Sequence, residues 1–553
     1  MKNSRIIASL LILTAIVIGL FQQSCKKKET IDEPVYLTVS LPKLTLQNEL
    51  YYSLRTNERA IELEFNQPID SSTIRGNFSF SDKSGNLDTT YTLITIDRKI
   101  VLMFQPGFTL KEGWRYLINI GTGLRSTSGT SFPSACTLEF RSSTLTLTLG
   151  ASSSTTRNAI LCISDIHLGE YRAVTENYCW FSKNQAALID LLDYVITGQQ
   201  VRQLVILGDL FDGWVIPYRS SPFDSAAGVY SPREYFLSVA NSPVNIPVIN
   251  KLKEIASNSD IQLIYVPGNH DMLLTKSILE EIIPGVVWQG NVPGLGNYSP
   301  VEEMIMEHGH RYDLFNCPQP LVNVGHILPP GFFISRLQAA GLKEHHTNLL
   351  KEGFATKGSV EFKLAWTLAF EYVRAQFAMT VHPDSVNILM NGIDGYTNRF
   401  SFNGIRDMYA ASIEDKWPAT QTQNAVPVQM PVVMAILDGN MDMFFAASYE
   451  YMSSVAPKKY KIVAFGHTHN PEIKVYPSGK NYQGIYANSG SWVNGELSSK
   501  AVRTYLMIWP GKWTGSDLDV VSLYQYNLNS GNGNPNPDYT HTLLAEESIN
   551  IGN

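Results

Sequence analysis

Five short blocks of polar residues stand out because each follows an apolar run and carries aspartate, asparagine or histidine. Six of the eleven histidines lie in these blocks. Carboxylate, imidazole and amide groups are ligands that divalent cations accept, and the lack of cysteine in the blocks argues against a structural zinc site. The blocks therefore predict a divalent metal site. They are Asp165-Ile166-His167, Gly208-Asp209-Leu210-Phe211-Asp212, Gly268-Asn269-His270-Asp271, Glu307-His308-Gly309-His310 and Gly466-His467-Thr468-His469.

The spacing within the blocks suits metal binding. At the end of a strand, alternate side chains point the same way, so Asp165 and His167 can reach one ion. A glycine before Asp209, Asn269 and His467 lets the backbone turn sharply and leaves room for metal or substrate. Together the blocks supply ligands for two ions with open positions, as two-metal phosphoester hydrolysis requires. A lone His-x-His pair more often caps a turn, but all five blocks in this order are not a chance arrangement.

The order of the blocks resembles the calcineurin-like metallophosphoesterase superfamily, over roughly residues 157–525. Residues 488–492 also match the closing strand of that family. The resemblance implies two divalent ions, and nitrogen and oxygen ligands leave their identity open among Mn, Fe, Zn and Ni. In the implied arrangement the first ion is held by Asp165, His167 and His469, the second by Asn269, His308 and His467, and Asp209 bridges both.

The same resemblance implies in-line displacement at phosphorus by a metal-bridging hydroxide. The bond would be a phosphomonoester, phosphodiester or pyrophosphate of a small-molecule substrate. His270 would act as general acid or as a donor to the phosphate, and Asp212 would orient it. No serine or cysteine nucleophile is needed. His310 is ambiguous, since it could contact the second ion, whereas the family pattern uses His308.

The second block separates branches of the superfamily. Protein Ser/Thr phosphatases place an arginine directly after the second aspartate, where this chain has Gly213 and Trp214. The sequence GDLFDGW, like DIHLG at 165–169, instead resembles the branch of the UDP-2,3-diacylglucosamine pyrophosphohydrolases. The resemblance predicts a scaffold and a reaction type but leaves the substrate open.

The elements that must position the blocks are short strands alternating with helices. Apolar runs at 160–163, 204–207 and 261–266 each end in a Gly- or Asp-bearing loop, and amphipathic stretches at 185–196 and 248–256 lie between them. This alternation predicts an α/β layered domain with buried strands, in which chemistry collects in the loops after the strands. We expect a four-layer metallophosphoesterase domain over 158–526, since the family sandwiches two layers of strand.

A separate module precedes this domain. Residues 35–145 alternate apolar and polar side chains, as in Ile61, Leu63 and Phe65, with turn clusters between the runs. Period-two alternation predicts an antiparallel all-β sandwich. The segments FNQPIDSSTI and LKEGWRYLINI resemble bacterial Ig-like domains, for which a spacer or scaffold role is expected, with carbohydrate or protein binding as the alternative. A linker at 146–157 would join it to the next domain.

Two insertions and the chain end complete the second domain. Residues 214–247 and 320–455 interrupt the block pattern, and the longer one carries amphipathic stretches at 361–377 and 434–452. An insertion with its own helices predicts a cap over the site, with a packing elaboration as the alternative. The polar run 527–538 predicts a flexible C-terminal segment, 527–553.

The N-terminus predicts export. Lys2 and Arg5 precede an uncharged apolar run at 6–21, and Ser24 precedes Cys25. This resembles a lipoprotein signal peptide at 1–24, with Cys25 as lipid acceptor and 25–34 as tether. We therefore expect an exported, membrane-anchored protein at the outer membrane, cell surface or periplasmic face. The alternative is an uncleaved N-terminal anchor.

Composition excludes several classes. The chain has 553 residues and a net charge of 43 − 50 = −7, which argues against binding of a nucleic-acid backbone. Five cysteines do not make a disulfide scaffold, and Cys162 lies in an apolar strand pattern typical of a core residue. The oligomeric state stays open. The alternative function is that of a surface-anchored binding or adhesion protein whose esterase-like domain is not catalytic.

Overall fold

The structure is a computed structural model, and the residues it describes begin near the start of the predicted β module. They are 37, 39–40, 45–47, 50–55, 59–82, 85–110, 115–143, 157–175, 181–217, 230–343, 365–366, 369, 388–397, 399–410, 412–426, 429–437, 443–454, 456, 458–477, 483–494, 500–528 and 539–550. The predicted signal peptide, Cys25 and the tether lie outside them, as does the linker up to residue 156. No helix in these ranges is long and apolar enough to cross a membrane.

The chain divides into two compact units. The first comprises Met1–Leu44 and Thr56–Arg141, and the second comprises Thr45–Arg55 and Ser142–Asn553. The second unit therefore includes a short antiparallel hairpin, β2 (Thr45–Gln47) and β3 (Leu50–Arg55), that lies far from the rest of it in sequence. The hairpin falls within the predicted module at 35–145, and β3 lies against β25 (Tyr539–Asn550) of the second unit.

The first unit is built from antiparallel strands. Ile61, Leu63 and Phe65 on β4 are at most 2% exposed, and the Phe80 ring stacks on Tyr116 at 5.5 Å between centroids. The period-two prediction of an all-β module is confirmed. One sheet has the order β1 (Val39–Ser40), β4 (Ala60–Phe65), β8 (Lys99–Phe104), β7 (Tyr91–Ile96); the other includes, in order, β10 (Cys136–Ser143), β9 (Arg115–Ile120), β5 (Phe78–Asp82), β6 (Gly85–Asn86).

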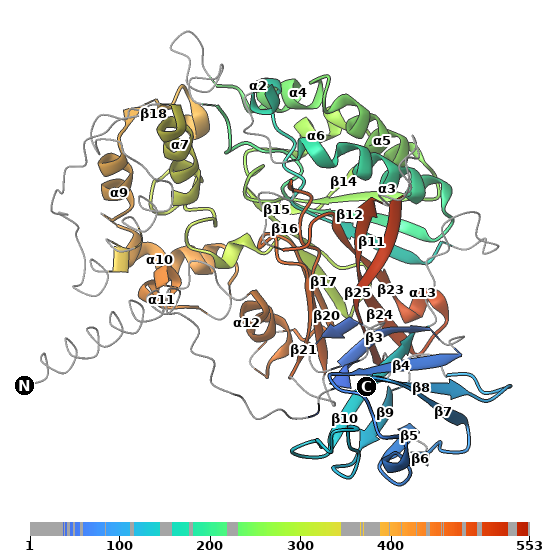
Figure 1. The fold of residues 1–553 in the computed structure, drawn as a ribbon. Coiled ribbons are helices and arrows are strands. Elements are labelled where there is room, and N and C mark those ends of the chain that lie inside the picture. The colour runs from blue at the N-terminus through green and yellow to red at the C-terminus, as the bar shows by residue number, and fades with distance from the viewer. Residues whose placement is uncertain are drawn as a thin grey trace, which may run out of the picture. The chain divides into compact units, whose positions relative to one another are not determined.

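The second unit holds two large sheets (Figure 1). The seven-stranded sheet is parallel from β14 to β11 and antiparallel from β11 to β25. Its order is β14 (Val287–Trp288), β13 (Gln262–Val266), β12 (Val201–Leu207), β11 (Ala159–Ile163), β23 (Thr504–Trp509), β24 (Leu518–Leu528), β25. The six-stranded sheet has the order β15 (Gly290–Val292), β16 (Leu295–Tyr298), β17 (Met304–Glu307), β20 (Ile462–Phe465), β22 (Gly484–Asn488), β21 (Glu472–Tyr476).

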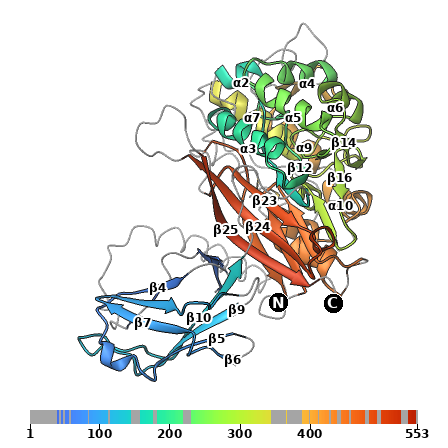
Figure 2. The same cartoon turned by 90° about the vertical axis from the view of Figure 1, so that its right-hand side faces the viewer.

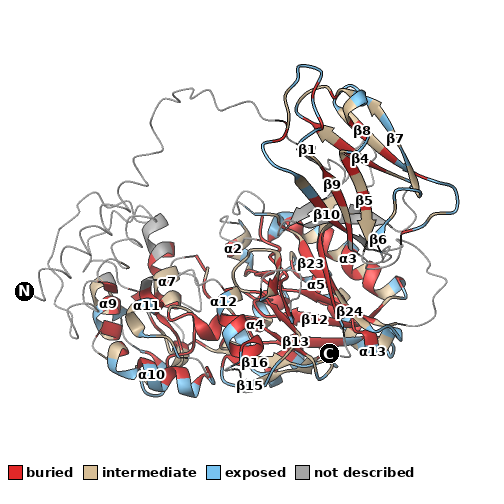
Figure 3. Cartoon of the chain, turned by 90° about the horizontal axis from the view of Figure 1, so that it is seen from below, coloured by how far each residue is buried: buried red, intermediate tan, exposed pale blue. Residues whose placement is uncertain are grey.

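The two sheets of this unit pack face to face. Ile160 and Cys162 of β11 join one apolar core with Met306 of β17, and the Cys162 and Met306 sulfur atoms are 3.9 Å apart. The alternate β11 residues Leu161 and Ile163 belong to a second core, shared with helices. Strands covered on both faces read as continuous apolar runs, which is why the sequence predicted them (Figure 3). Cys162 is a buried free thiol, as predicted.

Helices cover the seven-stranded sheet on the face away from the second sheet. Figures 1 and 2 show α3 (Gln185–Thr197) and α5 (Ile246–Ser257) side by side, each placing its leucines in the core. They confirm the predicted helices at 185–196 and 248–256. The remaining helices of this layer are α2 (Tyr171–Thr175), α4 (Pro232–Ala240) and α6 (Lys276–Ile282).

The longer insertion is mainly helical where it is described, with one short pair of strands. The helical stretch expected over 434–452 is described in part, as α11 up to Leu437 and α12 from Met443, and residues 438–442 lie outside the described residues. Most of 361–377 lies outside the described residues. The elements present are α7 (Pro330–Lys343), β18 (Ile388–Leu389), β19 (Arg399–Phe400), α9 (Phe402–Ala410), α10 (Ile413–Gln423), α11 (Val432–Leu437), α12 (Met443–Ala447) and a π-helix (Ser448–Met452).

The prediction of a flexible segment at 527–553 is wrong for its second half. β25 pairs with β24 along its whole length, from Leu518 opposite Asn550 to Leu528 opposite Tyr539. Ala545 and Ile549 are buried in the core between the sheets. The pairing supplies β25 with backbone partners and a buried face, so the domain extends to residue 550 rather than to 526.

Candidate metal centre

The five polar blocks follow five strands at their C-terminal ends. Three of the strands, β11, β12 and β13, are parallel neighbours in one sheet, while β17 and β20 are parallel neighbours in the other. Parallel neighbours bring the loops after them to one edge. A hydrogen bond joins the two edges, because the His467 backbone amide donates to the Asp165 side chain, at Oδ2, over 2.9 Å. The fold therefore gathers all five blocks.

The backbone at this edge is strained. Five non-glycine residues there have a left-handed φ: Asp165 (53°), His167 (55°), Asp209 (53°), His467 (70°) and His469 (54°). Each such residue costs about 1 to 2 kcal/mol and persists only where the surroundings hold it. Here the amides of Ile166 and His167 both donate to the Asp209 carbonyl, at 3.0 and 2.9 Å. Strain held in this way at a cluster of titratable side chains is typical of a functional site.

A first group of ligand atoms comes from Asp165, His167 and His469. The two histidines face each other through their Nε2 atoms, 3.1 Å apart. Asp165 Oδ1 lies 3.2 Å from His469 Nε2 and 3.9 Å from His167 Nε2. This oxygen is buried, yet it accepts no hydrogen bond from the described residues. Two facing ring nitrogens beside an orphaned carboxylate oxygen fit a cation.

A second group lies around His308. Its Nε2 atom is 3.3 Å from Asp209 Oδ2 and 3.0 Å from Asn269 Oδ1, and its Nδ1 donates to the Leu207 carbonyl at 2.6 Å. That bond fixes the ring so that Nε2 faces the acidic side chains. The His467 ring lies alongside, with its centroid 5.1 Å from that of His308. Asp209 Oδ2 is also 3.8 Å from His167 Nε2, so this carboxylate stands between the two groups.

His270 lies beside both groups. Its Nδ1 is 2.9 Å from Asp212 Oδ1, and its backbone amide donates to Asp209 Oδ1 at 2.8 Å. Trp214 stacks on the imidazole with ring centroids 4.6 Å apart, and its own amide donates to Asp212 Oδ1. The His167 and His270 rings meet edge to face at 4.5 Å. These contacts hold the His270 ring in one orientation, with its Nε2 edge away from Asp212.

Three glycines allow the blocks to approach one another. A Cβ on Gly268 would lie 2.1 Å from Asp209 Oδ1, and one on Gly208 would lie 2.6 Å from His308 Nδ1. A Cβ on Gly466 would lie 2.8 Å from Asp165 Oδ2. Glycine before Asp209, Asn269 and His467 therefore gives space to the neighbouring blocks, and room for metal or substrate remains a prediction.

The electrostatics of the site favour positive charge. Burial lowers the pKa of His308, but Asp209 and Asp165 outweigh it and raise the pKa to about 10. Burial raises the pKa of Asp165, but His469 and His308 outweigh it and lower the pKa to about 2. His167, in contrast, has its pKa lowered to about 4, chiefly by burial. Ionised carboxylates surrounded by nitrogen ligands make a site in which a divalent cation would replace the protons.

The structure thus brings all the sequence-predicted site residues to one edge of the two sheets, and their chemistry fits divalent cations bound by nitrogen and oxygen. Three groups of side chains could each hold a cation, because within each group the ligand atoms lie within 4.8 Å of one another. The groups are Asp165 with His167 and His469; His167 with Asp209 and His270; and Asp165 with Asp209 and His308. Asn269, Asp212 and His467 adjoin these groups through the contacts given above.

The His310 ring lies beside those of His308 and His467, with centroids 5.2 and 6.2 Å away, but its Nε2 has a backbone partner. It is buried, and its Nε2 donates to the Gly294 carbonyl at 2.8 Å. Burial and the neighbouring His308 and His467 lower its pKa well below the usual range. The family-based choice of His308 over His310 agrees with this geometry. Residues 489–492 form a loop after β22 rather than a strand, and the Trp492 amide in it donates to the Asp165 carbonyl.

Sequence reasoning missed three residues around the site. Asp271 of the third block accepts from the amides of Leu210 and Gly268, both at 2.9 Å, and so joins the second and third blocks. Asp313 and Asn316 follow the fourth block. Asp313 contacts His467 of the fifth block, and Asn316 contacts Asn269 of the third. Their only signal is the polar pair in DLFN at 313–316, which resembles an ordinary turn.

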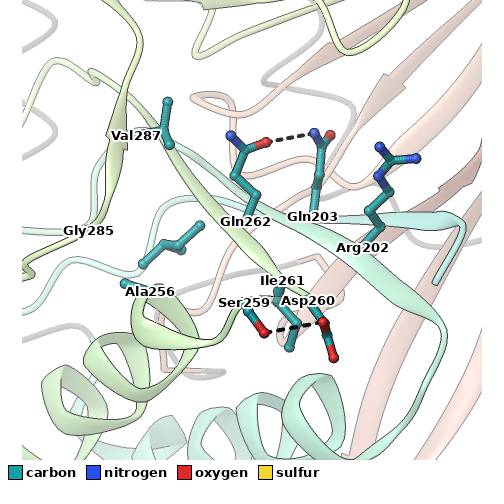
Figure 4. A pocket seen from close by; sticks show the side chains of 10 residues that line it. Arg202, Gln203, Ala256, Ser259, Asp260, Ile261, Gln262, Gly285 and Val287 are labelled. Atoms are coloured by element: carbon teal, nitrogen blue, oxygen red, sulfur yellow. Dashed lines mark hydrogen bonds between the residues drawn. The ribbon is translucent and has the colours of Figure 1, made fainter.

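A pocket of about 430 Å³ lies at the other end of the same strands (Figure 4). Arg202 and Gln203 near the start of β12 line it, with Asp260 and Gln262 near the start of β13. The Gln203 amide donates to Gln262 Oε1 at 3.0 Å. None of its lining residues is histidine or cysteine, so the pocket is separate from the metal centre.

Comparisons with known protein families agree with the two-unit organisation. Residues 159–353 match the family model of calcineurin-like phosphoesterases, and residues 53–142 match that of the bacterial Ig-like domain. No curated protein matches the chain. The chain therefore combines an Ig-like region of strands with an α/β metallophosphoesterase domain.

Solved structures resemble only parts of the chain. The N-terminal part of the bacterial S-layer protein SbsC is 17% identical, over 25% of this chain and 28% of that one, with a TM-score of 0.15. Domains MG0-NIE-MG1 of alpha-2-macroglobulin from Escherichia coli are 14% identical, over 27% and 38%, with a TM-score of 0.15. Nuclease MPE from Pseudomonas putida is 17% identical, over 27% and 53%, with a TM-score of 0.16. The chain covers less than two thirds of each, and these TM-scores support no argument about fold or activity.

Proposed function

We propose that this chain, which carries a calcineurin-like phosphoesterase domain after a bacterial Ig-like domain, hydrolyses phosphoester bonds with two divalent cations. The observation that carries the proposal is the place of Asp209. One carboxylate oxygen lies 3.3 Å from His308 and 3.8 Å from His167, between two groups that each offer further nitrogen and oxygen ligands. A shared carboxylate between two such groups is what a binuclear centre requires.

Each residue of the centre has a part in this proposal. Asp165, His167 and His469 would hold the first ion, Asn269, His308 and His467 the second, and Asp209 both. When bound, the ions would supply an activated water and neutralise the charge that grows on the phosphoryl oxygens. Asp165, His167, Asp209, Asn269 and His308 are buried, whereas His467 and His469 are partly exposed, so the centre is open to solvent on the side of the fifth block.

His270 is the proposed proton donor. With Nδ1–H held by Asp212 at 2.9 Å, the ring is fixed so that Nε2 can serve the leaving oxygen or a phosphoryl oxygen. The carboxylate also stabilises the protonated ring, because Asp212 and Asp209 raise its pKa against the opposing effect of burial. Trp214 adds a wall on one face of the ring.

The experiment compares p-nitrophenyl phosphate with bis-p-nitrophenyl phosphate as substrates of the full chain. Turnover with Mn²⁺ that stops with chelator, and that falls at least about 100-fold in Asp209→Asn, would support the proposal. The matched control is Asp519→Asn, a buried carboxylate that accepts only the Gly511 amide among the described residues. The ratio of the two rates sets the ester class. Turnover that persists in Asp209→Asn or in chelator contradicts the binuclear proposal.

Export and lipid anchoring are part of the proposal and rest on sequence alone. The basic start, the apolar run and Cys25 support a lipoprotein signal. Labelled palmitate should be incorporated into the wild-type chain and not into Cys25→Ser. A chain that fractionates with the cytoplasm would contradict export.

A further inference from the structure

A tight turn follows the fourth block and holds a buried carboxylate. The 3₁₀ turn His310–Tyr312 is followed by Asp313, whose side chain is only 7% exposed. Asp313 Oδ1 accepts from the Phe315 amide at 2.8 Å. Its Oδ2 accepts from the Asn316 side-chain amide and lies 3.4 Å from His467 Nε2. The turn therefore reaches a residue that is 154 positions away in sequence.

Both oxygens of Asp313 already have partners, so the carboxylate is placed to hold His467 rather than to bind an ion itself. A histidine that donates one ring N–H to a carboxylate offers its other nitrogen to a metal in a fixed orientation, and the carboxylate makes that nitrogen more basic. With Nε2–H directed at Asp313, the ligand atom of His467 is Nδ1. Within the turn, Asp313 accepts from the Phe315 amide and from the Asn316 side chain, so the His467 contact is the one that reaches outside the turn.

Asn316 connects the same turn to a second predicted ligand. Its side-chain oxygen is 3.4 Å from the Asn269 side-chain amide nitrogen. That contact directs the other end of the amide, Asn269 Oδ1, towards His308 Nε2 at 3.0 Å. The turn is itself held by the insertion, because the Gly331 amide at the start of α7 donates to the Phe315 carbonyl at 2.7 Å.

We propose that Asp313 and Asn316 are positioning residues for the second cation: Asp313 fixes the tautomer of His467, and Asn316 fixes the amide of Asn269. The inference rests on the metal centre of the proposed function and goes beyond it in naming a turn outside the five blocks. It also gives the first part of the insertion a role, since α7 packs on this turn.

The test measures metal binding by the full chain with Mn²⁺ alone. In Asp313→Ala we expect one ion to bind as in the wild type and the other to bind roughly 10- to 100-fold more weakly, by titration calorimetry and by metal content after dialysis. The paramagnetic resonance spectrum should change from that of a coupled ion pair to that of an isolated ion. Asn316→Ala should weaken the same ion by a smaller factor.

Two controls separate positioning from folding. Asp519→Ala removes a buried carboxylate elsewhere in the domain and should bind both ions with wild-type affinity. In a His467→Ala background, Asp313→Ala should weaken the second ion no further, because a residue that acts only through His467 has nothing left to orient.

The outcomes are distinct. If Asp313→Ala folds and binds both ions as tightly as the wild type, the positioning role is wrong while the metal centre stands. If Asp313→Ala weakens binding as much in the His467→Ala background as in the wild type, Asp313 does not act through His467. If the wild-type chain itself binds no divalent ion, the metal centre and this inference fall together.

Discussion

At the scale of single residues, the metal centre depends on how closely the blocks approach one another. The Cα atom of Gly268 faces Asp209, the carboxylate between the two ligand groups, and no side chain fits between them. The third block can therefore lie against the second only with glycine at this position. The same crowding recurs at Gly208 against His308.

Gly268→Ala should disrupt the centre while leaving the fold in place. Its Cβ would lie 2.1 Å from Asp209 Oδ1, so the carboxylate or the loop must move. A displacement of about 1 Å at a catalytic group lowers activity by about 100-fold. The measurement is kcat/KM together with bound metal. Gly404→Ala, in α9, is the control and should be nearly neutral, because among the described residues only the flexible Ser401 Oγ, at 3.3 Å, lies near its Cβ. Unchanged activity in Gly268→Ala would show that the close approach of Gly268 to Asp209 does not matter for the centre.

His270→Ala should show what the imidazole does. A proton donor matters most when the leaving group is a poor one, so the loss should be larger with phenyl phosphate than with p-nitrophenyl phosphate. We expect about 100- to 10,000-fold for the poorer leaving group, as is usual for general acids. The readout is kcat/KM across substituted phenyl phosphates. An equal loss for all of them would assign His270 to phosphate binding instead.

At the scale of elements, a buried ion network joins the end of β17 to the insertion. Arg311 Nε pairs with Glu307 at 2.8 Å, and its guanidinium lies 3.2 Å from Glu450 in the π-helix Ser448–Met452. One arginine thus faces two carboxylates. Burial raises the pKa of Glu450 to about 7, and Arg311 offsets only part of this effect.

This network predicts a pH dependence of stability. An unfolded glutamate loses its proton near pH 4.5, whereas folded Glu450 keeps it up to about pH 7. The folded state binds more protons between these values, so stability falls as pH rises from 4.5 to 7. Glu450→Gln should flatten this fall in the Tm of the second unit, measured from pH 5 to 8. Glu254→Gln, at an exposed position, should leave this fall of Tm with pH unchanged. A steeper fall of Tm with pH in Glu450→Gln would contradict a raised pKa of Glu450.

The elements that carry the blocks could be predicted because their physics is local. β11, β12 and β13 are covered on both faces, so they read as apolar runs ending at a polar loop. β25 could not be predicted in this way, because three consecutive polar residues, Glu546 to Ser548, are buried in it. The apolar residues there show no regular spacing, and the segment is a strand because it pairs with β24.

The site residues also fall into those that could be predicted from local sequence and those that could not. Its block residues could be predicted because each block follows a strand, and the carboxyl ends of parallel neighbouring strands lie at one edge of their sheet. The contacts of Asp313, Asn316 and Trp214 could not, since each depends on how a turn or ring packs against a block distant in sequence. The Asp313 contact with His467 joins the segments after two neighbouring strands of the six-stranded sheet, β17 and β20, and has no local signature.

At the scale of the whole molecule, the two units have separate cores and should respond differently to metal. A ligand stabilises only the unit that binds it. We expect two thermal transitions, of which chelator lowers only the one assigned to the second unit, and Asp209→Asn removes this difference. Calorimetry of the full chain with Mn²⁺ and with chelator makes the measurement. A single transition that shifts as a whole would show that the units unfold together.

Because of the hairpin β2–β3, a single proteolytic cut between the two units should not separate them. The chain enters the second unit at Thr45, leaves it at Arg55 and returns at Ser142. A nick in residues 144–156 therefore leaves part of the second unit on the N-terminal fragment. The fragments should separate on a denaturing gel and yet elute together in native buffer, as in a split protein reconstituted from two pieces. Shedding of the phosphoesterase from whatever holds its N-terminus would require a further cut on the N-terminal side of the hairpin, or release of the hairpin from the second unit by local unfolding.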